Sequence, residues 1–269
     1  QPVGFPAYLT LKKSIVLDGQ KYYTNISDHI RIDGALFNVY RDPGCTQIAT
    51  NESGVPAQLI TDANGNANLA EVFLTGPATV YVKEVASPTG TEINPNVFPV
   101  ALTQANTAAA PATLGQDVEN QIIPVPVKIK KSSVNTVVTK DNRMYSLANA
   151  EFTLTYIGAA GDPLNGKSYQ LHIDGNGDSE VVSVAPGNYQ VSETTAPNGY
   201  KAVGSFNWGI FPSTNGVQEI PVADEPIYGT LNSLVNKIVD PMYQTSRPTE
   251  GAELTVNYYD NPEPEEKAK

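Results

Sequence analysis

The feature that most constrains the fold is a repeat, because the same series of short alternating segments occurs twice along the chain. The first segment of each copy, Tyr8–Lys13 and then Val127–Lys131, alternates apolar and polar residues as a β-strand with one buried face does. Each copy also carries an Asn/Gly turn, at 62–66 and at 174–178, of the kind that closes tight hairpins. Gly and Pro number 21 each, which favours frequent turns over long helices. Repeats of roughly 100 residues with several short strands predict an all-β chain of β-sandwiches in series.

The repeat also predicts where the chain divides into domains. We expect a first domain over 1–124 and a second over 125–229. Residues 230–269 are expected to start a third copy, with Val235–Lys237 as its first strand and Gly251–Tyr259 as its second. The alternative is that this last segment adds strands to the second domain.

Charge and composition narrow the function classes. The formal net charge of −11 disfavours binding to nucleic acid and to anionic membranes, since both need clustered Lys and Arg, and it suits an extracellular surface. Cys45 is the single cysteine, so no intramolecular disulfide forms. No apolar run approaches the roughly 18 residues of a membrane span. The chain starts at Gln1 without a signal-peptide pattern, and we interpret it as a mature or trimmed form.

Each copy places three ionisable or amide side chains on a face that is otherwise apolar. They are a Lys on the first strand, a Glu in the middle and an Asn or Asp on the last strand: Lys13, Glu84 and Asn120, then Lys131, Glu193 and Asp224. A single lysine of this kind usually extends its ammonium group to solvent. The same triple in the same order, twice, favours burial instead, and buried charge is costly unless it is neutralised or paired.

At these residues the chain resembles the collagen-adhesin B-type (Cna-B, prealbumin-like) domains of Gram-positive surface proteins and pilins. The matching stretches are Lys-Lys-Ser at 12–14 and 130–132, Gly34-Ala-Leu-Phe37, Asn149-Ala-Glu-Phe152 and, most specifically, Val191-Ser-Glu-Thr-Thr-Ala-Pro-Asn-Gly-Tyr200. The resemblance implies tandem immunoglobulin-like sandwiches. It also implies that the inward Lys of the first strand bonds covalently to the Asn or Asp of the last strand, assisted by the Glu, as an intramolecular isopeptide.

That implication assigns one cross-link to each domain. Lys13 would bond to Asn120 with the help of Glu84, and Lys131 would bond to Asp224 with the help of Glu193. Lys237 resembles the same lysine of a third unit, but no partner strand follows it, so we expect it to be unbonded if 230–269 is a fragment. The first domain matches the pattern less well, because Glu84 lacks the Thr-Ala-Pro-Asn-Gly-Tyr continuation found after Glu193.

The residue types suit this chemistry. A lysine attacks a carbonyl only as a neutral amine, and burial in apolar surroundings favours that neutral form. The same burial favours a protonated Glu, which hydrogen-bonds the carbonyl oxygen and shuttles protons as the amine adds. Proximity in a folded core supplies the remaining driving force for a reaction that occurs once. The bond with Asn120 would release ammonia, and the bond with Asp224 would release water.

The resemblance further implies an extracellular, cell-wall-anchored stalk or pilin-type protein whose partners are sortase, peptidoglycan or other pilins, and host matrix or glycans. Two alternatives stay open: a dedicated adhesin for collagen, mucin or glycans, and spacer modules of a larger secreted hydrolase. The sequence departs from the family pattern in lacking a Leu-Pro-x-Thr-Gly sorting signal and a Tyr-Pro-Lys-Asn-type pilin motif. No acid–base pair or catalytic motif appears outside the two triples, so we do not expect an enzyme that turns over.

Other candidate sites carry weaker signals. Cys45 lies two residues before Gln47, but a loop position is expected there and we do not interpret the pair as a thioester. The 174–178 turn alternates acidic and amide residues like a calcium loop, yet Ser179 stands where an EF-hand needs Gly. His172 alternates within a strand and is expected on its surface. We therefore expect neither a metal nor a cofactor.

Overall fold

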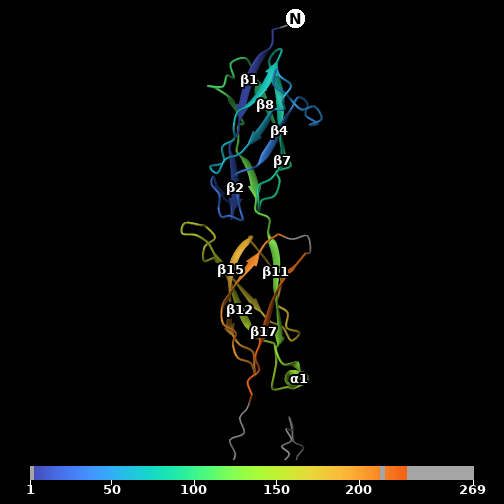
Figure 1. Ribbon diagram of the computed structural model, residues 1–269, viewed down its shortest axis with the longest axis vertical. Coiled ribbons are helices and arrows are strands. Elements are labelled where there is room, and N and C mark those ends of the chain that lie inside the picture. Colours follow the sequence, from blue (N-terminus) through green and yellow to red (C-terminus); the bar gives the residue numbers. More distant parts are fainter. Residues whose placement is uncertain (1–2, 213–215, 229–269) are drawn as a thin grey trace, which may run out of the picture.

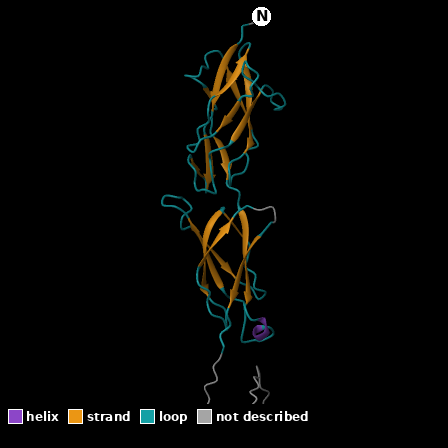
Figure 2. Cartoon of the chain, viewed as in Figure 1, coloured by secondary structure: helices purple, strands orange, loops and turns teal. Residues whose placement is uncertain are grey.

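The chain folds into strands that gather in two groups, placed one after the other along its long axis (Figure 1). The computed structural model describes residues 3–212 and 216–228. Figure 2 shows that the described part is almost entirely strand and loop, with one short helix, α1 (Thr136–Thr139). Apart from α1, the described residues form β-sandwiches, which confirms the all-β fold that alternation along the sequence predicts.

The first sandwich is made of β1–β10. These strands are β1 (Phe5–Thr10), β2 (Lys13–Leu17), β3 (Gln20–Tyr22), β4 (Leu36–Tyr40), β5 (Gln58–Ile60), β6 (Ala70–Leu74), β7 (Ala78–Ala86), β8 (Val97–Leu102), β9 (Ala112–Thr113) and β10 (Val118–Gln121). One layer is the sheet β5-β4-β7-β8, and the strands β6-β1-β9 and β10-β2-β3 form the other. The second strand of the sandwich, β2, and its last strand, β10, are parallel neighbours.

The second sandwich repeats this plan with β11–β17. Its strands are β11 (Val125–Ser133), β12 (Glu151–Ile157), β13 (Ser168–His172), β14 (Val182–Val184), β15 (Gly187–Thr195), β16 (Phe206–Ile210) and β17 (Gln218–Asp224). The sheet β13-β12-β15-β16 lies against the sheet β14-β11-β17. Here the first and last strands, β11 and β17, pair in parallel.

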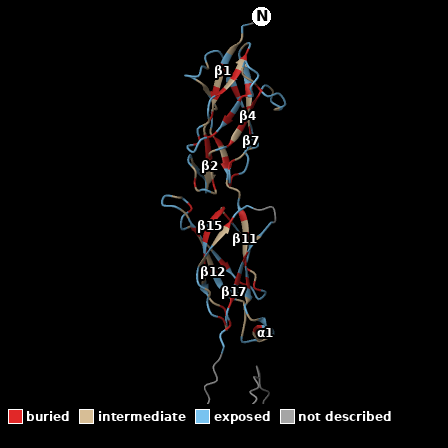
Figure 3. Ribbon diagram, in the orientation of Figure 1, coloured by how far each residue is buried: buried red, intermediate tan, exposed pale blue. Residues whose placement is uncertain are grey.

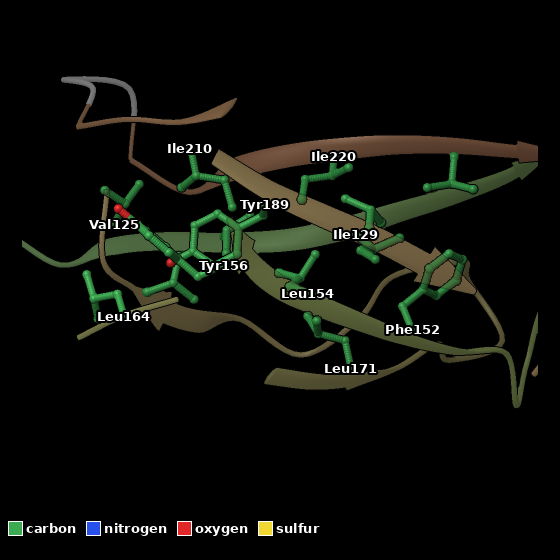
Figure 4. Close-up of a cluster of buried hydrophobic side chains, with 14 of the residues drawn as sticks. Val125, Ile129, Phe152, Leu154, Tyr156, Leu164, Leu171, Tyr189, Ile210 and Ile220 are labelled. Carbon is green, nitrogen blue, oxygen red and sulfur yellow. The ribbon is translucent and has the colours of Figure 1, made fainter. Parts of the chain in front are cut away.

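Alternation along the strands explains how the layers close on a core. In β11, Val125, Val127 and Ile129 are buried while the residues between them are partly exposed, which is the period of two that a one-sided strand requires. Figure 3 shows buried residues along the inner faces of both sandwiches. Figure 4 shows the second core, where Tyr156 and Tyr189 meet edge to face with ring centroids 5.2 Å apart.

The first strand differs from its prediction. The sequence predicts one strand over Tyr8–Lys13, but the structure divides it into β1 and β2 with a break at Leu11 and Lys12. The break occurs where the backbone changes partners: the Leu11 carbonyl accepts the Ala67 N–H, and Lys12 bridges to Asn66. Lys13 therefore begins β2 instead of ending the first strand.

The two sandwiches are in direct contact. Ile26, Ile30 and Ile32, from the loop between β3 and β4, belong to the same buried cluster as the core of the second sandwich. At the edge of this contact Lys167 Nζ donates to Asp18 Oδ2 at 2.9 Å. The rings of His29 and Phe211 also meet, with their centroids 4.7 Å apart.

Two further expectations concern parts of the chain outside these sandwiches. The proposed third copy at 230–269, including Lys237, lies outside the described residues. Within the described residues, no helix has the length and apolar character needed to span a membrane.

Candidate functional site

The lysine of each predicted triple lies inside its sandwich. Lys13 is 0% exposed and Lys131 is 2% exposed. Both follow the alternation of their strands: Leu9 and Leu11 precede Lys13 on the inner face, and Ile129 precedes Lys131. The alternative for a single lysine was that its ammonium group extends to solvent. Neither Lys13 nor Lys131 does so.

The parallel pairing of β2 with β10 and of β11 with β17 places the amide or acid at the same offset in both sandwiches. Lys13 is in register with Val118, and Asn120 follows two residues later on the same face. Lys131 is in register with Val222, and Asp224 follows two residues later. Diagonal neighbours of this kind lie within reach of a long side chain.

In the first sandwich, Glu84 joins the other two side chains through one oxygen. Lys13 Nζ donates to Glu84 Oε1 at 2.9 Å, and Asn120 Nδ2 donates to the same oxygen at 3.0 Å. Asn120 is 1% exposed, and its Oδ1 has no hydrogen-bond partner among the described residues. The structure thus brings all three predicted residues together in a buried site.

In the second sandwich, the lysine contacts both acids directly. Lys131 Nζ lies 2.6 Å from Glu193 Oε1 and 2.5 Å from Asp224 Oδ2. All three side chains are fully buried. The site therefore holds one amine between two carboxyl groups, again with all three predicted residues in contact.

Both sites contain a backbone contact that the sequence reading missed. The second oxygen of each glutamate accepts a backbone N–H from the residue ten positions later, so that Asn94 N donates to Glu84 Oε2 at 2.7 Å and Val203 N donates to Glu193 Oε2 at 2.7 Å. These bonds hold each carboxyl group so that Oε1 faces the lysine. Every residue except proline has a backbone N–H, so the residue types at 94 and 203 do not reveal these bonds. The only sign of them in the sequence is that the donor lies ten residues after the glutamate in both copies.

An aromatic ring also lies against each lysine and was not predicted as part of the site. Lys13 Nζ is 5.3 Å from the centroid of the Phe37 ring, and Lys131 Nζ is 4.8 Å from that of Phe152. Each Phe is in register with the glutamate of its site, next to an irregularity in the strand pairing. The sequence could have indicated these contacts, because both phenylalanines end matching stretches, 34–37 and 149–152, in the two copies.

Burial shifts the pKa of Lys13 and that of Asp224 in the directions that favour their neutral forms. Desolvation of the Lys13 ammonium lowers its pKa from the ordinary 10.5, against the opposing pull of the Glu84 carboxylate. Desolvation of the Asp224 carboxylate raises its pKa, against the opposing pull of Lys131. A neutral amine is the nucleophilic form of lysine, and a protonated acid has the better leaving group.

The weaker candidate sites lie away from these triples. Cys45 is half-buried in a loop at a positive φ of 55°, which agrees with the loop position expected for it. His172 lies at the end of β13 with its side chain exposed, and its ring contacts Glu180 at 3.1 Å. In the 174–178 turn, Asp174 accepts backbone N–H groups and Asp178 pairs with Lys130.

Comparison with known proteins finds a family match for the second sandwich. Residues 127–225 match the family model for SpaA, described as a prealbumin-like fold domain. No curated protein matches the chain.

Several solved structures are similar. The Bacillus anthracis TIE protein is 22% identical with a TM-score of 0.51, over 83% of this chain and 34% of that one, so this chain spans about a third of its length. A C-terminal fragment of the pilus adhesin SpaC from Lactobacillus rhamnosus GG is 13% identical with a TM-score of 0.41, over 84% of this chain and 100% of that one. A streptococcal ancillary pilin is 19% identical with a TM-score of 0.32, over 83% of this chain and 63% of that one. The second sandwich, over residues 127–225, thus matches a family model for a prealbumin-like fold domain.

Proposed function

We propose that the chain is a stalk of a Gram-positive cell-surface protein, with a structural or adhesive role, in which each sandwich is closed by one intramolecular isopeptide bond. The two domains are 1–124 and 125–229, and the bonds are Lys13–Asn120 and Lys131–Asp224. The observation that carries this proposal is the sealed Lys–Glu–Asn or Lys–Glu–Asp contact that recurs at one offset in both sandwiches.

The reaction in the first sandwich starts from neutral Lys13. Its Nζ adds to Cγ of Asn120, while Glu84 hydrogen-bonds the amide oxygen and passes protons from the incoming amine to the leaving nitrogen. The Cγ–Nδ2 bond breaks, ammonia leaves, and an amide bond joins Nζ to Cγ. The unpartnered Asn120 Oδ1 supports this route, because a half-turn of the amide group brings it to Glu84 Oε1.

The reaction in the second sandwich follows the same path with a different leaving group. Lys131 Nζ adds to Cγ of Asp224, and Glu193 carries the proton from nitrogen to the departing oxygen. Water leaves, and the same type of amide bond forms. The contacts of Lys131 Nζ with Glu193 and Asp224 support this assignment, since the amine lies between the group that moves the proton and the group that it attacks.

A stalk role follows from where the bonds lie in the fold. Each bond would join two parallel neighbouring strands, β2 with β10 and β11 with β17, which slide past each other when the chain is pulled from its ends. A covalent bond at this place carries the load past the residues between its ends. It needs no oxidant, which suits a chain with Cys45 as its single cysteine.

The partners are proposed on the same basis. The similar solved structures include a pilus adhesin and an ancillary pilin, which supports export and surface display, with sortase joining the protein to peptidoglycan or to other pilins. Host matrix or glycans are the proposed ligands of an adhesive role, and binding to a ligand array would separate that role from a purely structural one.

Intact-protein mass spectrometry tests the cross-links. We expect the mass to fall short of the sequence mass by one ammonia plus one water, and fragmentation to yield linked peptides that contain Lys13 with Asn120 and Lys131 with Asp224. A protein at full sequence mass would refute both bonds, and a deficit of one small molecule would refute one of them.

A further inference from the structure

A tight turn lies against the backbone of the buried lysine in both sandwiches, and the proposed reaction does not account for it. Lys13 N donates to the Gly65 carbonyl at 2.8 Å, and Lys131 N donates to the Gly177 carbonyl at 2.6 Å. These turns are the two Asn/Gly turns at 62–66 and 174–178. The backbone N–H of each buried lysine thus donates to the carbonyl of a glycine that is distant in the sequence.

The approach is so close that only glycine fits. A Cβ on Gly65 would lie 2.5 Å from the Lys13 carbonyl oxygen, and a Cβ on Gly177 would lie 2.3 Å from that of Lys131. The contacting atoms are backbone and cannot rotate away as a flexible side chain can. Both glycines also have positive φ, +72° and +82°, where other residues are strained.

The rest of each turn is built to hold its glycine in place. Oδ1 of Asp62 accepts two backbone N–H groups within its turn, both at 2.9 Å, and Oδ1 of Asp174 does the same at 2.8 and 2.9 Å. Outside the sandwich, Lys12 Nζ donates to Asn66 Oδ1 at 2.8 Å, and Lys130 Nζ donates to Asp178 Oδ2 at 2.7 Å.

The outer lysine therefore ties the turn to the strand, while the next lysine points inward to the reaction. These two different roles explain why two lysines are adjacent in both copies, at 12–13 and at 130–131. It also gives the 174–178 turn a role other than metal binding.

From these contacts we propose that Gly65 and Gly177 are positioning residues for cross-link formation. They act through the lysine backbone, because docking of the turn fixes the depth at which each lysine enters the core and so fixes Nζ beside its partner. This inference rests on the proposed isopeptide reaction and adds a determinant of its rate. A backbone shift of about 1 Å is enough to slow such a reaction roughly a hundredfold.

The test compares glycines that share backbone strain but differ in what surrounds them. Gly166 has a φ of +81°, close to the +82° of Gly177, and no atom lies within 4 Å of its added Cβ. Full-length chains with Gly177→Ala or Gly166→Ala are made by cell-free synthesis, quenched at timed intervals and weighed intact. We expect Gly177→Ala to delay loss of water roughly a hundredfold, and Gly166→Ala to leave it unchanged. Loss of ammonia in the first sandwich is the internal reference in both chains.

The first sandwich offers the same comparison. Gly65→Ala is matched by Gly54→Ala, since Gly54 has a φ of +80° and open space around its added Cβ. If Gly177→Ala leaves the second sandwich sensitive to trypsin, Asp174→Ala serves in its place, because it loosens the turn without adding an atom near Lys131. We expect that variant to fold and to lose water more slowly than the unmodified chain.

The outcomes separate this inference from the proposed function. An unmodified chain with no mass deficit overturns the cross-links themselves. An unmodified chain with both deficits, beside folded Gly177→Ala and Asp174→Ala chains that lose water at the unmodified rate, overturns the positioning role and leaves the cross-links intact.

Discussion

Replacement of Glu193 by Ala tests the second cross-link most directly. Glu193 is the group proposed to move the proton between Lys131 and Asp224, and its Oε1 lies 2.6 Å from Lys131 Nζ. Without it, the amine and the acid stay buried beside each other but lack a route for proton transfer. We expect Glu193→Ala to recover one water in its mass while still missing the ammonia of the first sandwich.

The stability effect follows from the length of the loop that the bond closes. The segment from Lys131 to Asp224 spans about 94 residues. By the chain-entropy relation used for disulfides, closing a loop of that length restricts the unfolded chain by about 4.7 kcal/mol at 25 °C. For a domain of about 100 residues, this corresponds to a fall in melting temperature of roughly 20–35 °C. Loss of the buried Glu193 contacts acts in the same direction.

Fluorescence of Trp208, the single tryptophan, reports unfolding of the second sandwich, because its side chain packs against that core. Glu180→Ala is the matched control, since Glu180 is an exposed acid of the same sandwich whose hydrogen bonds are to His172, and their loss should change stability by about 1 kcal/mol. A Glu193→Ala protein that still lacks both small molecules would refute the role of Glu193. Recovery of the water with a melting temperature close to that of Glu180→Ala would refute the entropic reasoning.

Three further predictions follow from the first sandwich and from the aromatic contact. Lys13→Met should restore the ammonia alone, and trypsin should then cut the first sandwich before the second. In Asn120→Ala, Lys13 stays unbonded, and its pKa in the folded chain is lower than the 10.5 of the unfolded chain. At a pH between these two pKa values the unfolded chain binds more protons than the folded chain, so stability should rise with pH. Denaturant titrations from about pH 7 to pH 10 measure this slope, which Lys13→Met/Asn120→Ala should lack. Phe152→Ala should destabilise the second sandwich by about 3–5 kcal/mol in denaturant titrations, and a smaller loss would show that the ring packs less tightly than its burial indicates.

Alternation along the strands was sufficient to predict the buried faces. It placed Lys13, Glu84 and Asn120 in phase with apolar neighbours, and the structure buries all three. The reason is that a strand has only two faces, so one apolar neighbour two residues away determines where a side chain points. The order of the strands then brings the ends of each sandwich together. For the second sandwich the fold also agrees with the matched family.

The missed features depend on backbone atoms and on packing between distant segments. The N–H groups of Asn94 and Val203 are the same in every non-proline residue, so residue type cannot reveal that they bind Glu84 and Glu193. The break at Leu11 and Lys12 arises from a change of partner strand, which alternation does not encode. The contact of Ile30 with the second sandwich was likewise hidden, because an isoleucine in a polar loop looks the same whether it is exposed or covered.

The positions of the two lysines determine which parts of the chain would carry load. Lys13 lies after β1, so β1 is outside the loop that the first bond would close, whereas β2–β10 lie within it or at its ends. Between Asn120 and Lys131 the load would pass through a short backbone segment that includes the start of β11. Force applied to the ends would therefore reach β1 before any strand that the first bond encloses.

The charged groups explain why these sites are better suited to a reaction than to ordinary salt bridges. A buried ion pair seldom repays the cost of removing both charges from water, so Lys131 between two acids is a poor way to hold a core together. Formation of the amide replaces the amine and one acid by a neutral group that needs only hydrogen-bond partners. The desolvation that lowers the pKa of Lys13 and raises that of Asp224 thus also favours the product over the unbonded side chains. Burial of the lysine in each sandwich thus destabilises the unbonded state and, by the same physical cause, would favour the proposed bond, which leaves the lysine nitrogen in a neutral amide.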